Sequence, residues 1–238
     1  MATKASRQPL SRERVLAAAV ALADGHGIQA LTMRRLAVDL GVEAMSLYYH
    51  LPDKETLLDG VAETVIAEIV AEAARKEAAK EEAAEKEAAE KDEDWRAVLR
   101  RQFLTARRVM LRHAWAPGLL GTRRTIPATL FAYYDGILGT LVGAGFSYHL
   151  AHRALHAFGS MPLGFAQEVF SPAPAGGSMD VDATEEELAG MAAAMPHLTA
   201  MMAAEVHAAT DPTLGWCDSQ VEFEFTLDLL LDGLERLR

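Results

Sequence analysis

LTMRRLAVDLGVEAMSLYYH, at residues 31–50, has the pattern of two short helices joined by a tight turn. Thr32 is a favourable N-cap for the first helix, because its hydroxyl can accept a hydrogen bond from a free backbone N–H. Gly41 follows where that helix must end, since glycine adopts the left-handed conformation of a helix C-terminus without strain. The inward-facing residues would be Leu36, Ala37 and Leu40 before the turn, and Val42 and Leu47 after it. The segment therefore predicts a helix-turn-helix, whose second helix has a size that fits the major groove of DNA.

The second helix leaves a set of small and amphipathic side chains exposed: Ala44, Met45, Ser46, Tyr48, Tyr49 and His50. Tyrosine hydroxyls can donate to phosphates, and tyrosine rings can pack on sugars or thymine methyl groups. Thr32 and Lys54 flank the motif at the starts of two helices, where hydroxyls, backbone amides and a cation suit phosphate oxygens. These residues indicate DNA binding. The alternative is that Tyr48 and Tyr49 merely pack a helical hairpin.

The sequence around the motif predicts two further helices of the same domain. Ser11 can cap a helix that ends by Gly27. Asp53 can cap a fourth helix, which begins at Lys54. We therefore expect a helix-turn-helix DNA-binding domain at residues 1–54.

The charge of the chain is unevenly distributed along its length. The formal net charge is −11, yet residues 1–54 hold seven Lys or Arg against five Asp or Glu. Residues 55–94 hold fourteen acidic and five basic residues. Because phosphate contact depends on the local field, the mildly basic N-terminal segment is compatible with DNA binding in an acidic protein.

Residues 55–94 are expected to form a connecting helix that includes the Ala/Glu/Lys-rich stretch AEAARKEAAKEEAAEKEAAEK at 71–91. Ala, Glu and Lys are strong helix formers, and several Glu–Lys pairs lie four residues apart. The stretch has no apolar stripe, which favours a solvated spacer over a partner-binding helix. It also lacks apolar heptads, which argues against a purely structural coiled-coil protein.

Residues 95–238 predict a larger helical domain, and the fold class is all-α. Helical periodicity dominates the chain, and no convincing alternating strand occurs. Helices are expected from Trp95 to Arg112 and at about 125–144, 147–170, 185–194, 196–209 and 218–237. The last helix is apolar over more than one stripe, which predicts that it faces both its own core and another chain.

Several classes of protein are disfavoured by the sequence. No apolar run is long enough to span a membrane and no apolar signal-peptide core is present, so we expect a cytoplasmic protein with no membrane partner. The single cysteine, Cys217, excludes an intrachain disulfide and a cysteine metal cluster. The chain has no Gly-rich phosphate loop, nucleophile elbow or paired-carboxylate spacing, which argues against an enzyme.

Three histidines, His149, His152 and His156, fall on one face of the helix expected at 147–170. Such a face can hold a metal ion, but no carboxylate lies within sequence reach to complete the site. Packing in a dimer interface or a pocket is therefore favoured, and we predict neither a metal nor a cofactor.

The run from Leu10 to Leu58 resembles the DNA-binding domain of the tetracycline-repressor (TetR) family. The helix caps, the glycine, the tyrosine pair and the Pro-Asp-Lys sequence all fall in register. The resemblance implies a ligand-responsive repressor that binds palindromic double-stranded operator DNA as a homodimer. It implies phosphate contacts from Thr32, Tyr48 and Lys54, and contacts near the end of the recognition helix from Tyr49 and His50. The full DNA-binding set that we predict is Thr32, Met33, Arg34, Ala44, Met45, Ser46, Tyr48, Tyr49, His50 and Lys54.

Segments across residues 95–238 are similar to the regulatory domain of the tetracycline repressors. They include LLGTRR at 119–124, ALHAFGSMPLGF at 154–165 and FEFTLDLLLDGLE at 223–235. The resemblance implies a helical ligand-binding and dimerisation domain at 95–238, whose helices near 147–170 and 218–237 form the four-helix bundle of the dimer. The metal-ligating histidine of those repressors is here Leu119, and a drug-contacting histidine is Val70. These departures disfavour a magnesium–drug chelate.

A small hydrophobic effector is the ligand that we expect, since ligand pockets combine apolar walls with a few polar groups. The predicted pocket residues are Gln102, His113, Trp115, Tyr133, Tyr134, Met161 and Phe165. Residues 114–121, next to the fourth helix, are expected to transmit ligand binding to the spacing of the two recognition helices.

Overall fold

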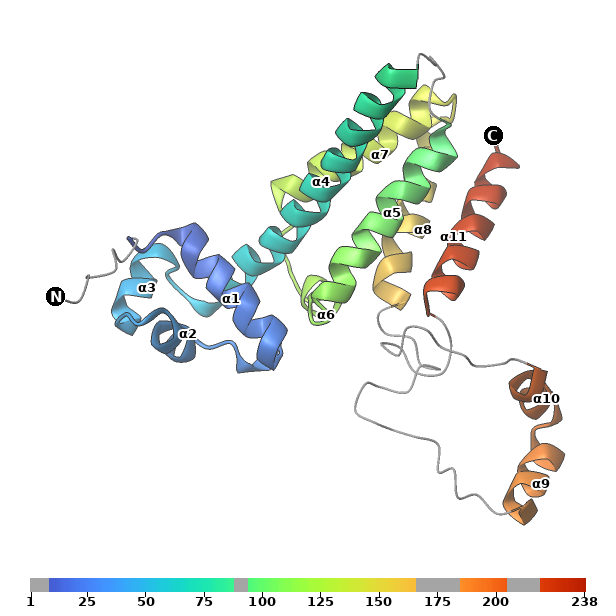
Figure 1. Cartoon of the computed structure of the whole chain (residues 1–238), viewed down its shortest axis with the longest axis horizontal. Helices are drawn as coiled ribbons and strands as arrows, with labels where there is room; N and C mark the ends of the chain where they lie inside the picture. Colours follow the sequence, from blue (N-terminus) through green and yellow to red (C-terminus); the bar gives the residue numbers. More distant parts are fainter. Residues whose placement is uncertain (1–8, 88–93, 166–184, 205–218) are drawn as a thin grey trace. The chain divides into compact units, whose positions relative to one another are not determined.

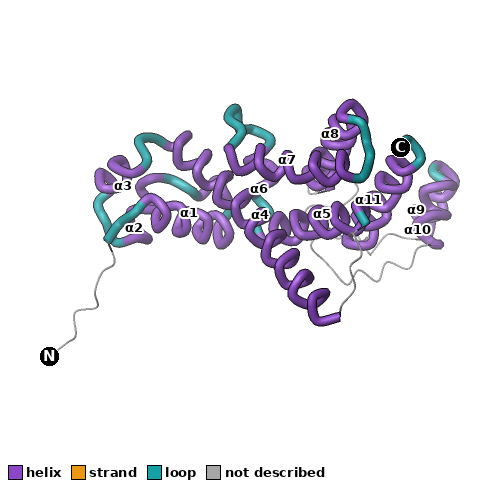
Figure 2. The backbone as a smooth tube through the Cα atoms, turned by 90° about the horizontal axis from the view of Figure 1, so that it is seen from above, coloured by secondary structure: helices purple, strands orange, loops and turns teal. Residues whose placement is uncertain are grey.

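The computed structural model describes residues 9–87, 94–165, 185–204 and 219–238. Within these ranges the regular structure is helical, with no strand, as Figure 2 shows. The all-α prediction is therefore confirmed. The chain divides into two compact units, Met1–Leu163 together with Leu234–Arg238, and Gly164–Gly233.

The N-terminal part of the first unit contains α1 (Arg12–His26), a 3-10 turn (Ile28–Ala30), α2 (Met33–Leu40) and α3 (Ala44–His50). The Ser11 hydroxyl accepts a hydrogen bond from the Arg14 N–H, and the Thr32 hydroxyl accepts one from the Arg35 N–H, each at 3.2 Å. Both helices therefore have the predicted N-caps. Gly41 ends α2 in the left-handed conformation, with φ at +65°, and so permits the tight turn into α3.

One apolar cluster holds these short helices together. Leu31, Leu36, Leu47 and Leu51 are fully buried in it, with Val15 of α1. Burial of a leucine side chain contributes roughly 1.5–3 kcal/mol, so this cluster is the main source of local stability. Leu47 is the buried residue of α3, Ala44 and His50 are half-buried, and Met45, Ser46, Tyr48 and Tyr49 are exposed.

α4 (Lys54–Glu87) is a helix of 34 residues, about 50 Å long. Leu57 and Val61 near its start belong to the helix-turn-helix core, whereas Val65 and Ile69 belong to a second cluster with residues of α5 and α6. The helix continues into the Ala/Glu/Lys-rich stretch, as predicted, and residues 88–91 of that stretch lie outside the described residues. Because α4 contributes to both clusters, a displacement of this helix changes the packing of both.

The first unit also contains α5 (Trp95–Arg112), α6 (Ala116–Leu120), α7 (Ala128–Gly143) and α8 (Tyr148–Phe165) up to Leu163. Figure 1 shows α5 and α7 beside α4, and these three helices contact one another in pairs. The short α6 packs against α4 as well. The helix expected at 147–170 begins as predicted, and residues 166–170 lie outside the described ranges.

The second unit contains α9 (Glu185–Ala194), which packs on α10 (Pro196–Ala204), and most of α11 (Ser219–Glu235). Phe223, Leu227 and Leu231 of α11 are buried. Another apolar stripe of α11, formed by Val221, Phe225 and Leu229, is exposed. No helix in the described part of the chain is long and apolar enough to cross a membrane.

Candidate DNA-binding surface and ligand pocket

α3 exposes most of its side chains. Tyr49 is 90% exposed, Met45 74% and Tyr48 41%. Ser46 is exposed too, while Ala44 and His50 are half-buried. The ring of His50 meets that of Tyr49 edge-on, with centroids 5.4 Å apart. Large apolar side chains gathered on an exposed surface mark a contact site, and a helix of this size fits a DNA groove.

The residues that flank α3 are placed to hold phosphates. Thr32, Arg34 and Lys54 are all exposed. The Thr32 oxygen accepts from a backbone N–H, so its O–H remains able to donate. Asp53 caps α4 by accepting from the Thr56 N–H at 2.7 Å, and this hydrogen bond holds the pKa of Asp53 below its ordinary value. Lys54 therefore stands at a helix N-terminus, where the helix dipole also favours anions.

Met33 does not belong to this exposed surface. Its side chain is 7% exposed and packs in the helix-turn-helix core. Met33, Leu36 and Ala37 follow the i, i+3, i+4 spacing of one helical stripe, and all three are buried. The prediction that Met33 contacts DNA is therefore corrected, and the apolar periodicity of α2 was the signal that would have excluded it.

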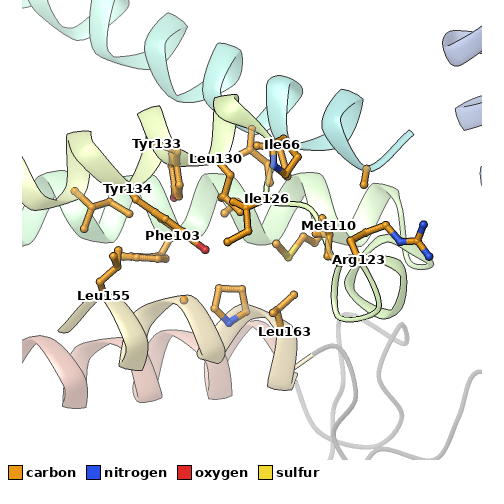
Figure 3. Close-up of a pocket in the computed structure, with 18 of the residues that line it drawn as sticks. Ile66, Phe103, Met110, Arg123, Ile126, Leu130, Tyr133, Tyr134, Leu155 and Leu163 are labelled. Carbon is orange, nitrogen blue, oxygen red and sulfur yellow. The ribbon is translucent and has the colours of Figure 1, made fainter. Parts of the chain in front are cut away.

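A mostly apolar pocket lies within the first unit, with a volume of about 190 Å³ (Figure 3). Residues of α4, α5, α7 and α8 line it, together with the end of α6 and the loop that follows it. Its apolar walls include Ile66, Phe103, Met110, Ile126, Leu130 and Leu155. Its polar lining residues are Asp59, Arg123, Thr125, Tyr133 and Tyr134. The pocket has the composition of a site for a small, largely apolar molecule.

The residues predicted to form a pocket are only partly brought together. Tyr133 and Tyr134 line the pocket. Gln102, His113, Trp115 and Met161 lie outside its lining, and Met161 is buried. Phe165 belongs to the second compact unit, where its ring meets that of Phe223 edge-on at 5.4 Å.

Sequence reasoning missed the charged corner of the pocket. The Arg123 side chain is 13% exposed, and its Nη1 lies 2.9 Å from Glu55 Oε2 and 3.4 Å from Asp59 Oδ1. Arg124, the next residue, is exposed. Two adjacent arginines look alike in a sequence, so no local signal shows which of them turns inward.

His113 and Trp115 instead form a polar junction between α1, α4 and the segment that joins α5 to α6. The two ring nitrogens of His113 lie 2.8 Å from Asp24 Oδ1 and 3.1 Å from Glu68 Oε2. Trp115 Nε1 donates to the same oxygen of Asp24 at 2.7 Å. We call Asp24, Glu68, His113 and Trp115 the His113 junction. It ties the end of α1, in the DNA-binding part, to the helices that line the pocket.

Arg112 reinforces the His113 junction from α5. Its Nη2 donates to Glu68 Oε1 at 2.6 Å and to Glu72 Oε2 at 2.7 Å. Burial by itself would raise the pKa of Glu68, but the hydrogen bonds from Arg112 and His113 outweigh it and hold that pKa below its ordinary value. Glu68 therefore acts in this junction as an ionised acceptor.

The three histidines of α8 do not gather with acidic residues. His149, His152 and His156 are exposed, and the Nε2 atoms of His152 and His156 lie 3.1 Å apart. Within the described ranges, no group of three or more His, Cys, Asp or Glu side chains could hold a metal ion.

Two family models match the chain over almost its whole length. The model described as "Bacterial regulatory proteins, tetR family" matches residues 15–61. The model described as "Tetracyclin repressor-like, C-terminal domain" matches residues 65–238. Tetracycline repressor protein class C of Escherichia coli is 30% identical over 234 residues, which cover 96% of this chain and 92% of that protein.

Solved structures resemble the chain over a similar extent. A structure described as a possible TetR family transcriptional regulator from Streptomyces coelicolor A3(2) is 29% identical, with a TM-score of 0.72, and covers 96% of this chain and 100% of its own. TetR from Acinetobacter baumannii AYE is 27% identical, with a TM-score of 0.64 and coverage of 97% and 99%. TetR-Q116A from the same source, in complex with minocycline, is 26% identical, with a TM-score of 0.63 and the same coverage.

Proposed function

The chain belongs to the TetR family of bacterial regulatory proteins, and we propose that it is a repressor that binds a palindromic operator as a homodimer and leaves the DNA when a small, largely apolar molecule fills the pocket. As a family member it is a DNA-binding transcriptional regulator and not an enzyme. One observation carries the finer proposal, which is that α4 serves both sites. Its first residue, Lys54, follows the end of α3 by four residues in the chain, and Asp59, Ile66 and Ile69 of the same helix line the pocket.

In this proposal α3 enters the major groove of the operator. Ala44, Met45 and Ser46 at its start approach the base edges, together with Arg34 of α2. Thr32, Tyr48 and Lys54 hold phosphates, and Tyr49 and His50 contact the backbone or bases at the end of the helix. The exposure of all of these side chains, complete or partial, supports the assignment.

A homodimer supplies the two recognition helices that a palindrome requires, placed about 34–36 Å apart. The exposed stripe of Val221, Phe225 and Leu229 on α11 repeats every four residues. On α8, Tyr148 is 74% exposed, in the same helix as His152 and His156. Exposed apolar side chains at helical spacing are typical of helix–helix interfaces, which supports α8 and α11 as the dimer contacts.

Release of DNA follows from the two roles of α4. A ligand that fits the pocket best when α4 is displaced shifts the dimer away from the spacing that the operator needs. The His113 junction connects α1 to α4 and to the start of α6, so a displacement of either helix reaches the DNA-binding part. Residues 114–121 remain the segment that we expect to transmit the change.

We do not propose that the effector of this chain binds as a metal complex. By the sequence resemblance, Leu119 stands where the tetracycline repressors have a metal-ligating histidine, and Leu119 is buried in the helix-turn-helix core. The largely apolar lining of the pocket instead favours a ligand with few polar groups.

Footprinting on the promoter of the protein's own gene and on selected random-sequence DNA tests the DNA-binding half. The wild type should protect a two-fold palindrome, less strongly at higher salt, because phosphate contacts release counterions. Tyr48→Ala and Lys54→Ala should lose this protection, whereas Gln29→Ala, an exposed change in the 3-10 turn, should keep it. No sequence-selective protection by the wild type, or full protection by both variants, would overturn the proposal.

Gly159 of α8 offers a test of the ligand half. It lines the pocket, and a Cβ added there would meet no atom within 4 Å. Gly159→Leu should therefore narrow the pocket and keep operator binding, while release by the effector is lost. Gly139→Leu, at an exposed site of α7, is the matched control and should respond as the wild type does.

A further inference from the structure

Two buried hydrogen-bonding groups on the pocket lining have no partner among the described residues. They are the Arg123 Nε–H and the Tyr133 hydroxyl. Buried polar groups in proteins are nearly always paired, and an unpaired one at a pocket wall is a natural contact for a ligand. We propose that the pocket selects a one- or two-ring aromatic molecule that places a hydrogen-bond acceptor on Arg123 Nε and a second polar atom at Tyr133. This inference rests on the proposed effector role of the pocket and adds the chemical class of the effector.

Arg123 determines that the ligand must carry an acceptor. A guanidinium has donors and no acceptor, and it remains charged under all ordinary conditions. Its Nη1 already donates to Glu55 and Asp59, and its Nη2 lies 3.4 Å from Thr122 Oγ1. Nε, the nitrogen next to the carbon stem, remains unpaired. A carbonyl or carboxylate oxygen would complete the guanidinium, and a carboxylate would do so more strongly because the bond is charge-assisted.

Tyr133 supplies a second polar contact farther along the pocket. Burial, with a smaller contribution from neighbouring Tyr134, raises the pKa of the Tyr133 hydroxyl, so the group stays protonated. A neutral hydroxyl can donate as well as accept. Figure 3 shows Arg123 near Met110 at one end of the pocket and the two tyrosines toward the other end. The ligand is therefore expected to be polar at two separated points, with an apolar body between them.

The walls and the volume determine what that body can be. Phe103, Ile126 and Leu130 surround the space between the polar points with aromatic and branched side chains. An apolar cavity of roughly 150 Å³ holds a benzene molecule. A pocket of about 190 Å³ therefore suits a one- or two-ring aromatic body.

The same arginine connects the ligand to the start of α4. Glu55 and Asp59 lie in the first two turns of this helix, immediately after Lys54. The guanidinium is planar and rigid, so a ligand acceptor that shifts Nε on binding also changes the distances from Nη1 to the Glu55 and Asp59 carboxylates. The polar end of the effector is thus sensed at the end of α4 that adjoins α3.

Three probes with one naphthalene body test the inference: 2-naphthoate, 2-acetylnaphthalene and 2-methylnaphthalene. Their dissociation constants are measured by fluorescence titration for the wild type, Arg123→Met and Arg124→Met. Arg123→Met should raise the dissociation constants of 2-naphthoate and 2-acetylnaphthalene by about tenfold or more, because a charge-assisted hydrogen bond is lost. The dissociation constant of 2-methylnaphthalene should change by no more than about twofold, and this result would also show that the pocket is intact. Arg124→Met removes the same charge from an exposed site and should change none of the three.

Two further variants keep the test decisive. Gly159→Leu should weaken all three probes, which locates them in the pocket. Arg123→Gln, which retains an N–H for Glu55, replaces Arg123→Met if the latter does not fold. Three outcomes would each overturn the inference. The Arg123 variants could weaken the binding of all three probes equally, they could weaken the binding of none, or the wild type could bind none of the probes. Operator binding is measured on the same samples without probe, so a failure of the repressor proposal is seen separately from a failure of the ligand assignment.

Discussion

Replacement of His113 by alanine should lower the free energy of unfolding by about 3–4 kcal/mol. His113 is 8% exposed, and both of its ring nitrogens face carboxylates. A hydrogen bond to a charged group contributes about 1.5–3 kcal/mol when buried. Asp24 and Glu68 are 33% and 35% exposed, so water weakens each bond and about 1–1.5 kcal/mol apiece is the appropriate range. Loss of the ring beside Trp115, with centroids 5.8 Å apart, adds roughly 1 kcal/mol.

Urea unfolding followed by far-UV circular dichroism measures this change. The protein concentration is held fixed, because the stability of the proposed homodimer would depend on it. His197→Ala, at an exposed site of α10, is the matched control and should stay within about 0.5 kcal/mol of the wild type. Asp24→Ala combined with His113→Ala should cost less than the two single changes together, since both remove the same hydrogen bond.

The His113 junction is also expected to transmit the effector signal. His113→Ala should therefore bind operator but require more effector for release than the wild type does. A loss of stability below about 0.5 kcal/mol, with unchanged release, would refute the reasoning, because it would mean that water replaces His113 at no cost.

Three further outcomes follow from particular contacts. Hydrogen bonds hold the pKa of Glu68 below its ordinary value of 4.5, so its ionised form stabilises the fold above about pH 4.5, and this stabilisation is lost as pH falls through the folded pKa. Glu68→Gln should therefore be less stable than the wild type by an amount that is constant above that pH and shrinks below it. A deficit that grows on acidification would contradict this. A Cβ on Gly60 would lie 2.7 Å from Leu16 Cδ2, so Gly60→Val should lower the free energy of unfolding by about 1–3 kcal/mol through overpacking of α1 against α4. Gly25→Val, where a Cβ would meet no atom within 4 Å, should lower it clearly less in the same urea titration. Tyr133→Phe removes a buried hydroxyl that has no partner among the described residues and should raise the free energy of unfolding by roughly 1 kcal/mol in thermal denaturation; a decrease of that size would show that the hydroxyl is hydrogen-bonded.

The helices and the recognition surface could be predicted because their signals are local. Ser11, Thr32 and Asp53 lie within three residues of the backbone N–H groups that they cap. Gly41 closes α2 through its own backbone conformation. The exposure of Tyr49 follows from its place on a helix that is anchored at Leu47. Met33 follows the same local signal, since the helical period that buries Leu36 in the helix-turn-helix core also buries Met33 there.

The pocket could not be predicted in the same way. His113 and Trp115 have the aromatic and polar character of ligand contacts, yet their partner Asp24 lies 89 and 91 residues away in sequence. Arg123 meets Glu55 and Asp59 across 68 and 64 residues, and nothing near Arg123 in the sequence distinguishes it from Arg124.

Sequence alone therefore determined the helical class, the helix-turn-helix and most of its exposed side chains, since caps, turns and helical periodicity act over a few residues. Tertiary structure alone decided which polar groups surround the pocket and which join α1 to α4. Those positions depend on how α4, α5 and α7 pack against one another, and that packing is the sum of many contacts between residues distant in the chain.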